Sequence, residues 1–507
     1  MRVGFGSDHT RYGDFYYGAK DNDLYYSVNY GKRTTDGYDD NIDRAPTNVN
    51  YGPREMEREW YGVKLAYDVD EHNKALFNYQ VSENSYGYYE NLAPTKQRGE
   101  RKSVTTQFGW QGRYDDGSAL NVNLSEYKLS KYNTWSSYLY NPNPVESREA
   151  DVNYSWYAGD KHHITVGASY KRDEADGMSQ VYADKTFKGV TYTAGTILER
   201  SGATTETKSF YLQDDIRLSD ATNLVLGGRY DSWKMKDAYD QNGAMDDADE
   251  SQFSPKAAVN YKVNDVTSYY ASVGKGFRSP DIFRLTRMWP QISSGLDNLY
   301  LYSNPNLEPE TLTMYEVGAK FNVGDKTSAT VSIYQNDVEN MIGQLTCEAK
   351  PGHSSGNAQN TPLMWENIGK ARIQGFEAEM NHRFDDHYSA FVSYTYADSE
   401  IREYKEAGYA GNHLEVVPEH EFKFGLNWQK AKWTTNLLGR YTSEVYEDAE
   451  NASSTDAVFL ADMKIGYAFD DKQSVSLAID NLLDREYESR GYLGNGRATY
   501  LEYSYQF

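Results

Sequence analysis

Cysteine is almost absent from this chain of 507 residues. Its single cysteine, Cys347, excludes an internal disulfide and any zinc site built from clustered cysteines. Basic residues are also scarce, because 52 lysines and arginines stand against 75 aspartates and glutamates, for a net charge of -23. Since no basic stripe is present to neutralise phosphates, nucleic-acid binding is not expected.

Long apolar runs are missing as well. The sequence contains no stretch of 18 apolar residues, which excludes a transmembrane helix. An enzyme constellation is also lacking: the only closely spaced histidines are the adjacent His162 and His163, and no nucleophile elbow is present. We therefore expect a protein that is not an enzyme.

Tyrosine is what the chain has in abundance, with 47 tyrosines and 9 tryptophans, so that aromatic residues make up 15% of the sequence. A tyrosine ring is apolar while its hydroxyl stays hydrated, which suits the aromatic girdles of a membrane barrel. The mean hydropathy of -0.81 does not oppose this interpretation. Barrel strands alternate lipid-facing and lumen-facing residues, so their average stays polar.

Alternation with a period of two is the clearest pattern along the chain. It is almost unbroken in residues 422–428, 459–469 and 327–333, where apolar side chains fall on one face and polar or small ones on the other. This period is typical of strands. Asp462 and Lys464 stand in mid-strand on the second face. Charged side chains there favour a wet lumen over a packed core.

Connections between the alternating segments are short and long in turn. The short ones are rich in Asp, Asn and Gly, as tight hairpins are. They lie at 21–23, 115–117, 159–160, 264–265, 324–325, 385–386 and 470–471. The long polar ones lie near 35–57, 84–100, 173–204, 277–310 and 339–364.

These features together predict an all-β fold: a closed antiparallel transmembrane β-barrel of about 22 strands, with short periplasmic turns and long extracellular loops. The barrel forms a single domain over residues 1–507. A lumen of that width would hold a folded plug. The last strand is the sharpest local signal, because Leu501, Tyr503, Tyr505 and Phe507 alternate with polar residues. We expect it to pair with the first strand, to close the barrel and to be recognised by the barrel-assembly machinery.

Four motifs then resemble those of TonB-dependent outer-membrane receptors. The first joins Gly276–Pro280 to Asn304–Glu310 and Glu316–Gly318, and the second joins Asn367–Ala371 to Ile373–Glu377. The third is Asn481–Tyr487, and the fourth is Gly496–Arg497 before the terminal strand. The first strands, at Gly4–Ser7 and Tyr26–Tyr30, are similar to those of cobalamin and siderophore receptors. By their composition, these motifs are expected to shape the barrel rather than to contact ligand.

The resemblance implies a location, a cargo and partners. Such receptors lie in the bacterial outer membrane, contact its lipid, bind a scarce metal chelate and are energised by the TonB complex through an amino-terminal plug. Neither a plug nor a signal peptide is found in this sequence, so a mature fragment is expected, and TonB would act only through the missing plug. We expect a monomer. Without a plug, the barrel could instead be a passive channel of large diameter.

The loop 277–310 is the strongest candidate for ligand binding. Arginine beside aromatic residues suits an anionic, ring-bearing chelate. Its candidates are Arg278, Arg284, Arg287, Trp289, Tyr300 and Tyr302, and a second loop adds Tyr86, Tyr88, Tyr89 and Arg98. The alternative is that these side chains only pack the loops or join the girdle.

A ferric siderophore is the preferred ligand. Haem receptors resemble this chain in the motifs Gly276–Pro280 and Asn304–Glu310, but they usually place a histidine between the two. Residues 281–303 contain no histidine. His353 and His413 lie in other predicted loops and could substitute, although a lone loop histidine is more often simply solvated. Cobalamin stays an alternative.

Two acidic clusters could bind a structural calcium ion, and no other cofactor is expected. They are Asp36, Asp39, Asp40 and Asp43, and Asp240, Asp246, Asp247 and Asp249. The alternative is a solvated anionic loop. Cys347 is most simply a lone loop thiol, or it pairs with a cysteine of the missing plug. A soluble all-β protein with a packed core is the remaining alternative to a membrane barrel.

Overall fold

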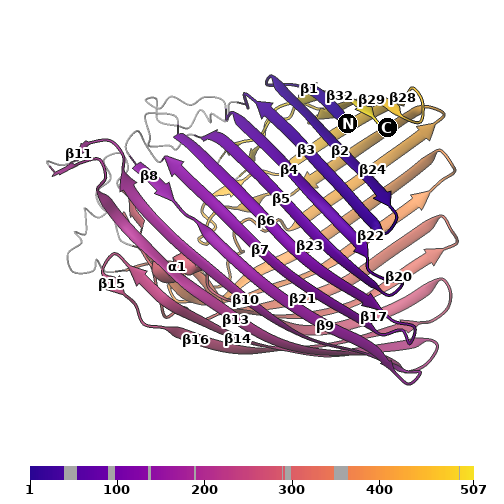
Figure 1. The fold of residues 1–507 in the computed structure, drawn as a ribbon, viewed down its shortest axis with the longest axis horizontal. Helices are drawn as coiled ribbons and strands as arrows, with labels where there is room; N and C mark the ends of the chain where they lie inside the picture. The colour runs from indigo at the N-terminus through magenta and orange to yellow at the C-terminus, as the bar shows by residue number, and fades with distance from the viewer. Residues whose placement is uncertain are drawn as a thin grey trace.

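The computed structural model describes residues 1–38, 54–88, 97–134, 139–187, 190–287, 289–291, 299–347, 363–489 and 492–507. Within them, 22 antiparallel strands form one closed barrel. Its strands are tilted, with compact turns at one end and the longer connections at the other (Figure 1). We name these the short-turn end and the long-loop end.

The wall strands in chain order are β1 (Arg2–Gly6), β2 (Thr10–Asp21), β3 (Leu24–Thr35), β4 (Met56–Asp68), β5 (Asn73–Tyr88), β6 (Gln97–Arg113), β7 (Ala119–Thr134), β9 (Val145–Ala158), β10 (His162–Val181), β13 (Ile197–Arg217), β14 (Thr222–Asp240), β16 (Ala248–Lys262), β17 (Thr267–Arg278), β20 (Glu310–Val323), β21 (Thr327–Thr346), β22 (Leu363–Arg383), β23 (Tyr388–Tyr404), β24 (His420–Lys430), β25 (Trp433–Thr442), β28 (Val458–Ala468), β29 (Gln473–Asp480) and β32 (Ala498–Tyr505).

The ring closes where the sequence predicts. β1 pairs with β32 in an antiparallel register that sets Phe5 opposite Leu501 and Val3 opposite Tyr503. The amino group of Met1 donates a hydrogen bond to the carbonyl of Tyr505 at 2.9 Å. Phe507 lies just past β32, and its ring packs against Phe15 of β2 with centroids 6.1 Å apart. The predicted closing strand is therefore confirmed.

The outer face is apolar around the barrel. Every second residue of each strand points to this face, and the register places such residues opposite one another, as in Leu65 opposite Phe77 and Phe77 opposite Phe108. Large apolar side chains on this face remain exposed, for example Phe108 at 55% and Ile333 at 60%. An apolar exterior of this kind belongs in lipid. The alternative of a soluble protein with a packed core is therefore excluded.

The inner face is polar. Residues of the opposite parity, such as Asn78 opposite Gln107, point into the lumen. Asp462 and Lys464 also lie on this face, and their outward neighbours Met463 and Ile465 continue the apolar band. The wet lumen expected from mid-strand charges is thus observed.

Several strands are longer than the sequence pattern predicts. The stretches 84–100, 173–204 and 339–364 read as loops, yet β5, β6, β10, β13, β21 and β22 extend into them. β13 and β22 each have 21 residues, whereas about 10 span a membrane. Beyond the apolar band the outward faces of β10 and β13 carry charged residues such as Arg172 and Glu206, so the alternation that reveals a strand disappears there.

The short connections are confirmed as tight turns. Asp385 in the turn between β22 and β23 accepts the backbone N–H groups of His387 and Tyr388 at 2.7 and 2.9 Å. Asp470 does the same for Lys472 and Gln473 between β28 and β29. No helix in the described ranges is long and apolar enough to cross a membrane.

One pair of neighbouring strands separates before reaching the long-loop end. β16 pairs with β17 only from Lys256 opposite Gly274 to Lys262 opposite Ser268. β16 stays paired with β14 up to Ala248, and β17 stays paired with β20 up to Arg278. The wall is therefore split between the far halves of β16 and β17. A hollow of about 340 Å³ lies there, lined in part by Lys275 and Phe277.

Candidate functional site

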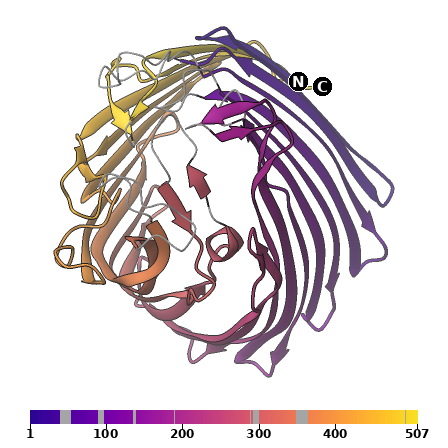
Figure 2. The same ribbon diagram turned by 90° about the vertical axis from the view of Figure 1, so that its left-hand side faces the viewer.

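The chain between β17 and β20 folds back into the barrel at the long-loop end. It contains the helix α1 (Ile282–Thr286) and the short strands β18 (Trp289–Gln291) and β19 (Leu299–Tyr302). Viewed from this end, these elements lie inside the ring of strands (Figure 2). Asp281 caps the helix by accepting the N–H of Phe283 at 2.9 Å. We call residues 279–309 the inner loop.

The inner loop is held by an apolar contact with the wall. Leu285 of α1 is fully buried against Trp233 and Met235 of β14 and Ala203 of β13, and Leu307 closes the same cluster. These wall residues occupy lumenal positions where a wet barrel would expose them. Their burial fixes the helix on β13 and β14, and it explains why apolar residues stand on a polar face.

Arg287 holds the inner loop by charge. Its Nε lies 3.1 Å from Oε2 of Glu199 on β13, and both side chains are essentially inaccessible to solvent. The guanidinium also contacts Asn143 and donates to the Met178 carbonyl at 3.3 Å. Burial lowers the pKa of Arg287, while the Glu199 carboxylate opposes that shift. The exposure expected of Arg287 as a ligand-contacting residue is not found.

Two asparagines from the receptor-like motifs anchor the far end of the inner loop. Asn304 donates to the carbonyl of Trp365 at 2.9 Å. Asn367 accepts the N–H of Glu308 at 2.8 Å and donates to its carbonyl at 2.9 Å. These side-chain amides provide hydrogen bonds to backbone groups that are not paired within a sheet. The expected structural role of these motifs is confirmed.

The third motif is a clamp of the same kind. The amide of Asn481 donates to the carbonyls of Arg485 and Asn495 and accepts the N–H of Arg485. Asp484 accepts the N–H of Arg497 from the fourth motif at 2.9 Å. The two motifs therefore form one turn that leads into the closing strand.

Gly369 and Gly375 of the second motif lie within β22. A Cβ on Gly369 would stand 1.8 Å from the carbonyl oxygen of Glu403, and one on Gly375 would stand 2.2 Å from that of Tyr396. The pairing register with β23 shifts between Lys370 and Ala371. A close backbone approach and a bulge therefore both occur in this part of β22, in keeping with the structural role expected of the motif.

Two arginines of the inner-loop region remain accessible from the lumen. Arg278, at the end of β17, pairs with Glu310 but keeps 69% of its side chain exposed. Arg284 on α1 lies over the ring of Trp365, 4.5 Å from its centroid. Arg278 thus lies where the chain enters the inner loop, and Arg284 lies within that loop and covers the ring of Trp365.

The other candidates of this loop lie nearby. Tyr302 is fully buried, so the exposure expected of it is not found either. β19 extends the wall by pairing in parallel with the start of β22, Leu301 opposite Leu363. In the β18–β19 hairpin, the backbone of Trp289 lies opposite Leu301, and that of Tyr300 lies opposite Pro290.

Tyr86 and Arg98, predicted to act together, lie on opposite faces of the wall. Tyr86 points into the lumen, where its ring covers Gly99 of β6. Arg98 points outward, pairs with Glu100 and is 65% exposed. Tyr88 ends β5, and Tyr89 lies outside the described residues. Of this set, Tyr86 is the side chain placed toward a lumenal ligand.

The possible metal ligands do not converge in the described part of the chain. Within it, no group of three His, Cys, Asp or Glu side chains is arranged to hold a metal ion. Asp36 instead contacts His9 at 2.8 Å, and Asp240 caps its own turn. His413 stacks on Tyr446 with ring centroids 5.6 Å apart. Asp39, Asp40, Asp43 and His353 lie outside the described residues.

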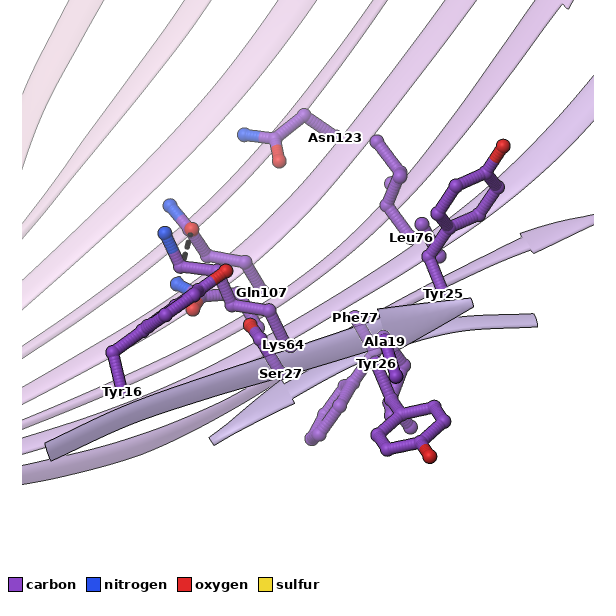
Figure 3. Close-up of a pocket in the computed structure, with 15 residues that line it drawn as sticks. Tyr16, Ala19, Tyr25, Tyr26, Ser27, Lys64, Leu76, Phe77, Gln107 and Asn123 are labelled. Atoms are coloured by element: carbon purple, nitrogen blue, oxygen red, sulfur yellow. Dashed lines mark hydrogen bonds between the residues drawn. The ribbon is translucent and has the colours of Figure 1, made fainter. Parts of the chain in front are cut away.

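A separate hollow of about 620 Å³ lies on the lumenal wall of β2 to β7 (Figure 3). Tyr16, Lys64, Gln107 and Asn123 line it, and Asn78 donates to Gln107 at 3.0 Å. Sequence analysis did not single out these residues. The available signal was one amide at the inward parity of each of three neighbouring strands, Asn78 on β5, Gln107 on β6 and Asn123 on β7, which provides hydrogen-bonding groups for a guest inside the barrel.

Comparisons with known proteins agree with this architecture. The family described as TonB dependent receptor-like, beta-barrel matches residues 2–482. The "Iron-regulated outer membrane virulence protein" of Vibrio cholerae serotype O1 (strain ATCC 39541 / Classical Ogawa 395 / O395) is 26% identical over 381 residues. That match covers 71% of this chain and 53% of the relative, so the chain spans about half of that protein.

Solved structures show the same fold. The copper transporter OprC superimposes with a TM-score of 0.79 at 16% identity, covering 100% of this chain and 79% of that one. The siderophore receptor PiuA from Acinetobacter baumannii gives 0.76 at 16% identity, covering 100% and 81%. With a closed apolar-faced barrel and a family match over nearly its whole length, the chain belongs to the TonB-dependent receptor β-barrel family of the bacterial outer membrane.

Proposed function

We propose that this chain is the barrel of a receptor that takes up a ferric siderophore. The observation that carries the proposal is the presence of two arginines at the inner loop, the exposed Arg278 and Arg284 over the ring of Trp365, in a barrel of this family. Guanidinium groups bind carboxylate or catecholate oxygens through charge-assisted hydrogen bonds, and aromatic faces stack on ligand rings. The similarity to an iron-regulated protein and to a siderophore receptor supports this cargo.

In the complete receptor we propose that a plug occupies the lumen and couples to TonB. The relatives are about twice as long as the part this chain matches, which leaves room for such a domain. The amide-lined hollow on β2 to β7 supports the idea, since side-chain amides can hydrogen-bond to the backbone of a folded guest.

Binding of ferric chelates to the purified barrel tests the cargo. Isothermal titration with ferric catecholate and ferric hydroxamate siderophores, each compared with its iron-free form, should show saturable binding of one class. Arg278→Gln and Arg284→Gln should each weaken that binding about tenfold, the loss expected for one charged hydrogen bond.

Arg98→Gln is the matched control, because Arg98 points to the outer face. It should bind as the unmodified barrel does. Equal losses in all three variants, or no saturable binding of either chelate class, would count against the proposed cargo.

A further inference from the structure

A proline ends the pairing between β16 and β17. The backbone N–H of Val263 donates to the carbonyl of Thr267 at the start of β17, whereas that of Lys262 donates the other way, toward β14. Because backbone groups alternate in direction along a strand, the odd-numbered residues of β16 face β17. Pro255 is one of these residues and has no N–H to donate. The pairing accordingly stops at its neighbour, Lys256, and the split begins there.

Two open strand edges lie beyond the proline. By the same alternation, the N–H and C=O groups of Asp249, Ser251 and Phe253 point away from β14 and toward the split. On β17, the backbone groups of Lys275 and Phe277 point toward it from the other side. Among the described residues, no strand pairs with either edge. A row of unpaired backbone groups of this kind is a template for another strand.

The hollow in the split crosses the wall of the barrel. Glu250 and Gln252 line it from the lumenal face of β16, and Ser251 lines it from the outer face of the same strand. Lys275 contributes from the outer face of β17, and Glu308 belongs to the inner loop. The hollow of about 340 Å³ therefore connects the outer surface with the inner loop.

Carboxylates dominate the charge of this hollow. Glu250, Glu308 and Glu339 line it, against the single cation Lys275. In the described part of the chain, Glu250, Glu339 and Lys275 form no ion pair, and Glu308 accepts a hydrogen bond from the amide of Asn340 at 3.1 Å. A positively charged occupant is therefore favoured, and the phosphate of a lipid would be repelled.

We propose that the split between β16 and β17 binds a basic, extended segment of a partner protein at the cell surface. The segment would add a strand to the open edge of β16, with main-chain hydrogen bonds to Asp249, Ser251 and Phe253. Its alternate side chains would enter the hollow and meet the carboxylates. Phe253 is 57% exposed on the apolar outer face, where unpaired backbone groups are costly, so the added strand also satisfies the wall. The proposal does not depend on the cargo of the barrel.

A fluorescent peptide of about seven residues, in which lysine alternates with valine, is long enough to cover residues 248–254 and serves as the probe. Fluorescence anisotropy should show saturable binding to the purified barrel in detergent. Hydrogen–deuterium exchange of 248–255 should slow when the peptide is bound. The same peptide with N-methyl groups on every second backbone nitrogen should bind at least about tenfold more weakly, because its main-chain hydrogen bonds are lost.

The variant Glu250→Gln/Glu339→Gln tests the charge of the hollow. It should weaken binding of the lysine peptide about fivefold, the loss expected for two partly exposed ion pairs. Asp386→Asn/Asp471→Asn removes the same charge from exposed turns at the short-turn end and is the matched control. Its affinity should stay within about twofold of the unmodified barrel. Equal losses in the two double variants would overturn the proposal.

The variant Pro255→Val tests the open edge itself. The residue is exposed on the outer face, so valine fits there and restores the missing N–H. The pairing of β16 with β17 should then lengthen, exchange of 275–278 should slow without peptide, and peptide binding should fall at least about fivefold. Unchanged binding would overturn the proposal, as would equal binding of the N-methylated peptide. Barrel dimers that dissociate when the peptide is added would overturn it as well, because the edge would then belong to a second copy of this chain.

Discussion

Three lumenal tyrosines cross over a glycine of a neighbouring strand and donate their hydroxyl to a carboxylate. A Cβ on each glycine would overlap the ring, at 2.2 to 2.4 Å. The sets are Tyr12 with Gly4 and Glu502, Tyr211 with Gly167 and Asp151, and Tyr270 with Gly318 and Glu316. The glycines therefore make room for rings that tie neighbouring strands together.

Gly318→Ala should destabilise the barrel by about 1–3 kcal/mol, the usual cost of overpacking. The new methyl would stand 2.4 Å from the ring of Tyr270 and displace its hydroxyl from Glu316. Urea unfolding in detergent would measure the loss. Gly276→Ala is the control, because nothing lies within 4 Å of its Cβ position. Equal midpoints for the two variants would refute the role of the glycine.

The turn aspartates Asp385 and Asp470 predict a dependence on pH. Backbone N–H groups hold the pKa of each carboxyl below its ordinary value of 3.8. Their stabilisation is present above that value and is lost as the pH falls through the depressed pKa. Asp385→Asn/Asp470→Asn should therefore reduce the loss of thermal stability between pH 5 and about pH 2.

The neighbouring Asp386 and Asp471 provide the control for these turns. They accept no backbone hydrogen bond of this kind in the described structure, so Asp386→Asn/Asp471→Asn should keep the acid dependence. The sequence predicts both turns from their paired aspartates. It does not reveal which member of each pair caps the turn, because that depends on the backbone angles of the hairpin.

At the scale of elements, the strand periodicity gives the number and order of wall strands but not their length. The far ends of β10 and β13 carry Arg172, Glu174 and Glu206, whose mutual ion pairs replace contact with lipid. In a sequence, a run of such charged residues predicts a loop rather than a strand. Their pairing across strands follows from the register, which only the folded sheet supplies.

The split between β16 and β17 predicts uneven exchange of backbone amides. The halves that pair, 256–262 and 268–274, should exchange slowly, while amides in 275–278 should exchange faster than those of the fully paired β21 and β22. Hydrogen–deuterium exchange with mass spectrometry resolves these segments. Equal protection of residues 268–274 and 275–278 would show that the wall is continuous in solution.

The ion pair of Arg287 with Glu199 predicts how the inner loop is held. Glu199→Gln leaves the Arg287 charge buried without its partner and should cost about 3–5 kcal/mol of loop stability. Limited proteolysis should then cleave within 279–309. Glu199→Gln/Arg287→Met removes both charges and should restore part of the protection. A single variant as resistant as the unmodified barrel would mean that the apolar contact of Leu285 alone suffices.

For the whole molecule, closure could be predicted from sequence and the inward fold of the loop could not. Alternation in the first and last strands and an even strand count indicate a ring. The inner loop depends on Leu285 meeting Trp233 and Met235, residues far away in the chain. A helix of five residues is too short to show an amphipathic period, so the sequence carries no signal for that contact.

Closure itself rests on the five residues of β1, which is antiparallel to both β2 and β32. A chain lacking residues 1–6 would bring together β2 and β32, which run parallel to each other and match no existing register. Two open edges would face lipid, where unpaired backbone groups are costly. We expect this chain to lose the compact, heat-modifiable form seen by gel electrophoresis. Val3→Phe/Phe5→Val keeps the strand and its outward face and should retain that form, whereas compact barrels from the shortened chain would contradict the role of β1.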